Sequence, residues 1–272
     1  MANPYHEDSE ALAINNTYAR RFLARLALHT TAKLFNRDGP CIPISKHRIL
    51  KTGYSVHLTE AVTMKYVAEN TSIPVPKVYC SFLHRNSNLA GAWRYLSEES
   101  LQKIFLQLKD MIQELRALQP LPNTGVESCV GGSLYDSRLP HGALRFGPFK
   151  TAQEFHRWLR NNLEPTRIGD HVTDQDADDI KAMIAKQNGQ WPPPVFTHRD
   201  LNPSNILNRG DEIVGIVDWE FSGWYPPIGN TRLRGLEILL EGEWQSILLS
   251  LFEPYPEELE MERTRSKWWG EW

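Results

Sequence analysis

The segment from Val195 to Asp218 limits the folds open to this chain more than any other part of the sequence. It contains the pattern His-Arg-Asp-Leu-x-x-x-Asn, whose polar positions include His198, Asp200 and Asn205. Asp218 follows thirteen residues after Asn205, and short apolar runs lie before, between and after these positions. Such runs are typical of short buried strands. We therefore predict a strand, a tight loop and a hairpin that bring Asp200, Asn205 and Asp218 to one end of a sheet.

Two carboxylates and one amide in this arrangement suit phosphoryl transfer from a nucleotide. That reaction needs an acceptor hydroxyl held in line and divalent cations that screen the phosphate charge. Asp200 can accept or orient the hydroxyl proton, and the oxygens of Asn205 and Asp218 suit a hard cation such as Mg²⁺. Asp and Asn also cap turns without any catalytic role. The hypothesis therefore depends on the full set with its flanking strands.

Helical periodicity and turn residues predict the remaining elements. Helices are expected over residues 8–35, 58–69 and 97–115, in the tail after Asn230, and after Thr151 and Thr173, where capping-box spacing occurs. Short strands are expected at 41–44, 47–51 and 77–82. Residues 120–150 are rich in Gly, Pro and Ser and predict a long surface loop.

The motif resembles the catalytic and metal-binding loops of the protein-kinase-like superfamily. Asp218-Trp219-Glu220, in place of Asp-Phe-Gly, is similar to the aminoglycoside phosphotransferase and choline kinase branch, and most of all to fungal proteins described as aminoglycoside phosphotransferase-like. The resemblance covers about residues 30–228 and includes Ile49-Leu50-Lys51 and Glu60-Ala61. It implies an α+β bilobal fold, with a small N-terminal sheet lobe at 1–88 and a larger, mainly helical C-terminal lobe at 89–272.

The resemblance also implies which residues bind the cofactors ATP and Mg²⁺. Lys51 would contact the nucleotide phosphates, and Glu60 would pair with Lys51 and hold it in place. Asn205 and Asp218 would be the metal ligands. A lysine and a glutamate nine residues apart are also an ordinary surface pair, so this assignment depends on the downstream motif.

For the reaction itself, the resemblance implies that Asp200 is the catalytic base and that His198 supports the loop. The γ-phosphate of ATP would move to a hydroxyl of a small-molecule acceptor. Arg199 departs from the pattern, since relatives often carry Gly there, and it reads as a solvated side chain. Glu220 reads more as a turn residue than as part of the site, and Tyr225 reads as core packing.

Two other functions remain open from the sequence. Ser81 to Trp93 has no apolar strand where relatives form the adenine-binding hinge, which would leave the N-terminal sheet lobe incomplete and favour a catalytically impaired pseudokinase that acts as a binding protein. The literal His-Arg-Asp-Leu suggests a protein kinase, although no Ala-Pro-Glu segment follows. Hydrolase motifs such as G-x-S-x-G and H-E-x-x-H, and the Walker A motif, are absent.

Composition bounds the partners and the location. The 272 residues carry a formal charge of -3, which favours neither a nucleic-acid nor a membrane partner. The N-terminus lacks the positive start and apolar block of a signal peptide. Three widely spaced cysteines predict neither a disulfide framework nor a zinc site, so a cytoplasmic location is expected. The oligomeric state is not predicted.

Overall fold

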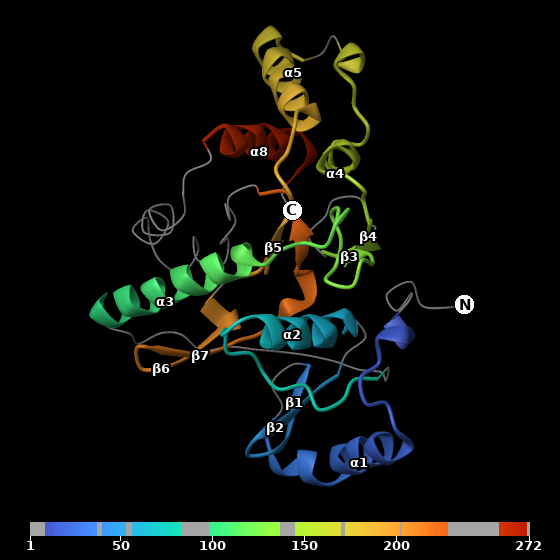
Figure 1. Cartoon of the computed structure of the whole chain (residues 1–272), viewed down its shortest axis with the longest axis vertical. Helices are drawn as coiled ribbons and strands as arrows, with labels where there is room; N and C mark the ends of the chain where they lie inside the picture. The colour runs from blue at the N-terminus through green and yellow to red at the C-terminus, as the bar shows by residue number, and fades with distance from the viewer. Residues whose placement is uncertain are drawn as a thin grey trace. The chain divides into compact units, whose positions relative to one another are not determined.

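The computed structural model divides the chain into two compact units (Figure 1). It describes residues 9–36, 40–52, 56–82, 98–136, 145–169, 172–201, 203–227 and 256–270. The first unit comprises Met1–Ile104 and Asn202–Glu220, and the second comprises Phe105–Leu201 and Phe221–Trp272. The predicted lobe boundary at 88/89, the hinge segment 83–93 and the tail from 230 to 255 lie outside the described residues. These expectations stay predictions.

The first unit begins with three short helices. These are η2 (Ser9–Leu12), α1 (Tyr18–His29) and η3 (Thr31–Leu34). The prediction of one helix over residues 8–35 is therefore wrong. Asn15 takes a left-handed conformation with φ 49°, and the Thr17 side chain accepts a hydrogen bond from the amide of Arg20 as an N-cap. These two local features start a new helix at Tyr18.

Two hairpins and one helix form the rest of the first unit. Strands β1 (Cys41–Ser45) and β2 (Arg48–Lys51) pair antiparallel, as predicted, and α2 (Thr59–Asn70) follows. Strands β6 (Ile206–Arg209) and β7 (Glu212–Ile216) form the second hairpin after the turn η5 (Pro203–Asn205). The turn η6 (Trp219–Phe221) comes next.

The strand predicted at residues 77–82 is absent from the described part of the first unit. The backbone between Pro74 and Ser81 bonds to separate partners and forms no continuous ladder with one strand. Pro74 accepts a hydrogen bond from the amide of Ile216 at 2.8 Å, and Ser81 exchanges two with Ile14, at 2.9 and 3.0 Å. Isolated bonds of this kind satisfy the backbone without a ladder.

Helices dominate the second unit. Helix α3 (Glu98–Ala117) begins in the first unit and continues into the second from Phe105. After it come α4 (Ala152–Leu159), η4 (Pro165–Arg167), α5 (Asp174–Asn188) and α8 (Pro256–Trp269), and α5 packs against both α4 and α8. The predicted caps are confirmed, because Thr151 accepts from the amide of Glu154 and Thr173 from that of Asp176. The predicted N-cap Ser97 lies outside the described residues.

Short strands complete the second unit. β5 (Val195–Thr197) pairs with β8 (Gly223–Tyr225), and β3 (Leu134–Tyr135) pairs with β4 (Arg145–Phe146). The expectation that β5, β6 and β7 share one sheet is wrong, because β6 and β7 pair only with each other among the described strands. The sequence pattern predicted β5, β6 and β7 but not β3, β4 or β8, and it did not predict the partner of β5.

The described parts of region 120–150, residues 120–136 and 145–150, contribute to the core of the second unit and are not only a surface loop. Val126 and Phe149 exchange backbone hydrogen bonds of 2.8 and 3.0 Å. A core cluster combines buried residues of this region with residues of α4 and β8: Val126, Leu134, Phe146, Phe155, Leu159 and Tyr225. The prediction failed because the Gly and Pro content of this region obscured its apolar residues, which are buried by partners distant in sequence.

Candidate active site

Lys51, Glu60 and Asp218 meet in the first unit. Lys51 ends β2, Glu60 lies in the first turn of α2, and Asp218 follows β7. The Lys51 Nζ lies 2.8 and 2.9 Å from the two carboxylate oxygens of Glu60 and 2.7 Å from Oδ1 of Asp218. One ammonium group therefore joins three elements of the fold, two of which are more than 150 residues apart.

The electrostatics of this cluster keep Lys51 charged. Burial by itself would lower the pKa of Lys51, but the carboxylates of Glu60, Asp218 and Glu220 outweigh this effect and raise it above its ordinary value. A lysine in this state is a permanent cation. It can bind phosphate oxygens but cannot act as a base near neutral pH.

The backbone holds Asp218 and Asn205 in defined positions. Asp218 is left-handed, with φ 64°, a conformation that costs free energy outside glycine and often occurs at functional sites. The neighbouring Trp219 is fully buried and donates its indole N–H to the carbonyl of Ile216 at 2.9 Å. The carbonyl of the buried Asn205 accepts from the amide of Val217 at 2.8 Å, which joins the loop before β6 to the end of β7.

Glu220 belongs to the same cluster, which the sequence interpretation missed. Oxygens of Glu60, Asp218 and Glu220 all lie within 4.8 Å of one another. Carboxylate oxygens at this spacing are donors that Mg²⁺ prefers, so these residues fit the cation, and Asn205 lines the same cavity. The available signal for Glu220 was its place two residues after Asp218.

A large cavity opens beside these residues in the first unit. Its volume is about 1720 Å³. Lys51, Glu60, Asn205 and Asp218 contribute to its lining, with further walls from α1, the β1–β2 hairpin and residues 76–82. The predicted phosphate-binding and metal-binding residues of this unit therefore all face one space that is large enough for a nucleotide.

His198 and Asp200 lie in the second unit, in the loop after β5. The amide of Asp200 donates to Nδ1 of His198 at 3.2 Å, which assigns the ring proton to Nε2. His198 is buried, and its carbonyl accepts from the Ser222 hydroxyl at 3.0 Å. The structure describes this loop within its own unit, so the role of Asp200 relative to Asn205 and Asp218 stays a prediction.

Arg199 is not merely solvated, contrary to the sequence interpretation. It is left-handed, with φ 71°, and its guanidinium carbon lies 4.6 Å from the centre of the Tyr225 ring. The Tyr225 hydroxyl in turn donates to the carbonyl of Phe221 at 2.9 Å. A cation–π contact on a buried ring thus fixes the residue directly before Asp200.

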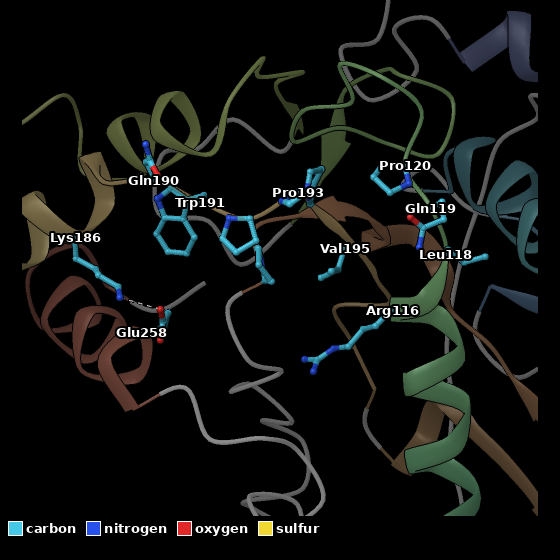
Figure 2. A pocket seen from close by; sticks show the side chains of 13 residues that line it. Arg116, Leu118, Gln119, Pro120, Lys186, Gln190, Trp191, Pro193, Val195 and Glu258 are labelled. Atoms are coloured by element: carbon cyan, nitrogen blue, oxygen red, sulfur yellow. Dashed lines mark ion pairs between the residues drawn. The ribbon is translucent and has the colours of Figure 1, made fainter.

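A second, smaller cavity lies in the second unit. Its volume is about 370 Å³, and Figure 2 shows Arg116, Trp191 and Pro193 around it with the Lys186–Glu258 ion pair at 3.0 Å. It borders Val195, the first residue of β5, whereas Asp200 follows the other end of that strand. This cavity therefore does not include the predicted catalytic loop.

Comparisons with known proteins point to phosphotransferases. No curated protein sequence matches the chain significantly. Among solved structures, a thermostable mutant of the aminoglycoside phosphotransferase APH(4)-Ia, in a ternary complex with ADP and hygromycin B, is 16% identical with a TM-score of 0.43, and the match covers 71% of this chain and 64% of that one. The chain thus spans less than two thirds of that relative.

Two further solved structures are similar at the same level. The gentamicin complex of APH(2")-IIa is 14% identical with a TM-score of 0.42, covering 77% of this chain and 69% of the other. The macrolide 2'-phosphotransferase MphH from Brachybacterium faecium, as apoenzyme, is 15% identical with a TM-score of 0.39, covering 78% and 64%.

The family model gives the assignment. The model described as "Phosphotransferase enzyme family" matches residues 58–228, which contain α2, the His-Arg-Asp loop and Asp218. This span is more than half of the chain. The predicted fold class, α+β of the protein-kinase-like kind with small sheets and a larger helical part, is confirmed. The chain belongs to the phosphotransferase enzyme family.

Proposed function

We propose that this protein transfers the γ-phosphate of ATP to a hydroxyl of a small molecule. The observation that carries the proposal is the contact of Lys51 with both Glu60 and Asp218 beside the large cavity. A purely structural ion pair would need only Lys51 and Glu60. Asp218 adds a second carboxylate from a distant loop, and this carboxylate can leave Lys51 to bind a metal cation while Glu60 still holds the ammonium group.

The residues of the first unit would bind the nucleotide. Lys51, kept cationic by its carboxylates, would contact phosphate oxygens, and Glu60 would hold its ammonium group in place. Asp218 and Asn205 would provide oxygen ligands for Mg²⁺, and Glu220 lies close enough to Asp218 to join them. Mg²⁺, when bound, screens the phosphate charge and orients the γ-phosphate.

Asp200 would receive the proton of the acceptor. As the acceptor oxygen bonds to the γ-phosphorus, the bond from phosphorus to the β–γ bridging oxygen breaks, and ADP leaves with that electron pair. The hydroxyl proton passes to the Asp200 carboxylate. His198 would fix the amide of Asp200 through its Nδ1, and Arg199 would anchor the loop on Tyr225. The lobe boundary at 88/89 and the cytoplasmic location also stay predictions.

Nucleotide binding is tested by thermal denaturation with Mg-ATP. At about 100 times its dissociation constant, the ligand should stabilise the folded protein by about 2.7 kcal/mol. Lys51→Met should remove this shift. Lys65→Met, on the exposed side of α2, removes an equal charge that pairs with the exposed Glu69 at 3.6 Å, and it should retain the shift. A wild-type protein that shows no shift up to millimolar ATP would support the pseudokinase alternative.

Catalysis is tested by ADP formation with a panel of hydroxylated small molecules. Asp200→Asn should lower turnover by about 10²–10⁴-fold while the Mg-ATP thermal shift remains. Unchanged turnover in this variant would reject Asp200 as the base. Phosphate transfer to peptides, but not to small alcohols, would instead favour a protein kinase.

A further inference from the structure

Helix α1 turns its large apolar side chains to solvent. Tyr18, Phe22 and Leu26 follow one another at four-residue spacing and are 94%, 64% and 46% exposed. The opposite face, which packs on the first unit, presents the small residues Ala24 and Ala27, and Ala24 is buried. A helix that only covered a core would have the reverse arrangement.

The apolar surface continues onto neighbouring elements. η3 packs against α1 and β1, and Leu34 on η3 is 79% exposed. Ile49, on β2 of the adjoining hairpin, is 64% exposed. We call Tyr18, Phe22, Leu26, Leu34 and Ile49 the α1 surface. It extends over several elements and is therefore broader than the single stripe that one helix presents to a groove.

The same part of the chain is strongly basic. Between residues 11 and 59 there are eight lysine and arginine residues and one acidic residue, Asp38. Arg25 on α1 and Lys33 on η3 are exposed, and neither forms an ion pair with another described residue. The expectation of no membrane partner rests on the whole-chain charge of -3, an average that hides this segment.

Charge decides between the candidate occupants of the α1 surface. A second copy of the chain would bring two helices without acidic residues face to face, and their arginines would repel. A nucleic acid would not bury the exposed Phe and Leu side chains. Large apolar residues flanked by Arg and Lys on a surface helix suit the interface of an anionic bilayer, where the apolar groups insert and the cations meet phosphate.

We propose that the α1 surface docks peripherally on anionic phospholipid membranes. The structure has no helix among its described residues that is long and apolar enough to cross a bilayer, and a peripheral contact needs none. This inference does not rest on the proposed function, because the α1 surface shares no residue with the Lys51–Glu60–Asp218 cluster, although Ile49 and the flanking Arg25 also line the large cavity.

Co-sedimentation of the full chain with vesicles tests the proposal. Binding is expected to vesicles of phosphatidylcholine mixed with phosphatidylserine, but not to phosphatidylcholine alone, and to weaken as salt increases. Phe22→Ser with Leu26→Ser should lower the partition coefficient about tenfold or more. Arg25→Glu with Lys33→Glu should lower it at least about fivefold per residue, since each basic residue loses its attraction to the surface.

Matched substitutions elsewhere keep the test specific. Leu121→Ser replaces another exposed leucine, in the second unit, and Arg209→Glu reverses an exposed charge on the β6–β7 hairpin. Both should bind vesicles like the wild type, and all variants should keep the thermal midpoint. The proposal is overturned if the wild type does not bind anionic vesicles, if it binds neutral ones equally, or if the α1 substitutions have no effect. Light scattering that shows dimers dissociated by Phe22→Ser with Leu26→Ser would overturn it in favour of a second copy.

Discussion

The two units each contain a cluster of buried charges, and the clusters differ in what surrounds them. In the first unit, Lys51 bridges Glu60 and Asp218 at the wall of a large cavity. In the second, the fully buried Arg265 binds Glu262 of the same helix, with contacts of 2.6 to 2.9 Å, and donates to the carbonyl of Gly270. One cluster joins distant segments beside open space, and the other is enclosed.

A neighbouring pair of residues completes the enclosed cluster. Arg160 donates to Gln187 and Asn188 at 3.0 Å each, and so connects α4 to α5. His156 is buried, neither ring nitrogen has a hydrogen-bond partner among the described residues, and its ring lies 4.7 Å from that of Trp191. Because both clusters are buried and only one lines a large cavity, buried charge alone does not mark a functional site. The open cluster should govern ligand binding, and the enclosed one should govern stability.

Glu262→Ala should have the largest effect on stability. It leaves the guanidinium of Arg265 buried without its carboxylate, a loss of about 3–5 kcal/mol of unfolding free energy in comparable pairs. Urea denaturation measures this loss. Glu260→Ala is the control, because Glu260 lies on the same helix and makes an exposed pair with Arg263 at 3.3 Å, worth less than about 1 kcal/mol. Equal effects of the two substitutions would show that the enclosed pair has no special role.

Asp218→Asn should have the next largest effect, and on activity alone. Asparagine tolerates the left-handed conformation at this position, so the thermal midpoint should stay near that of the wild type. Loss of the carboxylate should reduce Mg²⁺-dependent turnover by about 100-fold or more. Asp211→Asn on the same hairpin removes an exposed carboxylate that pairs with Lys103 at 3.0 Å, and it should leave turnover unchanged. A matching loss in both variants would contradict the assignment.

Protonation of His156 should have a smaller effect, which appears in the pH dependence of the unfolding free energy. Burial lowers the pKa of His156 from its ordinary 6.5 to about 3; Glu262 opposes this shift, and Arg160 and Arg265 add to it. Below about pH 6.5 the unfolded chain therefore binds a proton at His156, whereas the folded protein binds this proton only below about pH 3. The unfolding free energy should fall with decreasing pH in this window, by at most about 1.4 kcal/mol per pH unit from this group.

Replacement of the ring isolates that contribution. His156→Phe should flatten the pH dependence between about pH 6.5 and pH 3, as measured by urea denaturation at several pH values. His47→Phe, on the exposed β1–β2 turn, serves as the control and should leave the slope unchanged. A slope that persists in His156→Phe would assign the acid sensitivity to other groups.

Local signals predicted those parts of the fold that depend on few residues. The Thr151 and Thr173 caps, the β1–β2 hairpin and the apolar stripe of α3 were all readable, because each is specified within about one or two turns of chain. The burial of region 120–150 was not readable, since Phe146 becomes a core residue only through Phe155 and Tyr225. Segment 77–82 likewise depends on a partner distant in sequence, because Ser81 bonds to Ile14.

The candidate site divides in the same way. The loop from His198 to Asn205 and the position of Asp218 followed from a contiguous motif. The contact of Lys51 with Asp218 could not follow from spacing, because the two are 167 residues apart, and the family resemblance implied only that Lys51 pairs with Glu60. Glu220 was misjudged because a carboxylate two residues beyond another fits a turn equally well in sequence. In the structure their oxygens lie within 4.8 Å of each other, on either side of the buried Trp219.

The left-handed backbone of Asp218 has a consequence for how this protein would respond to selection. Glycine adopts φ 64° without penalty, so exchanging the aspartate for glycine relaxes the chain while removing a charged group. Variants chosen only for heat tolerance would be expected to accumulate that exchange, and those chosen for turnover would reject it. Selection for stability and selection for activity would therefore favour different residues at position 218.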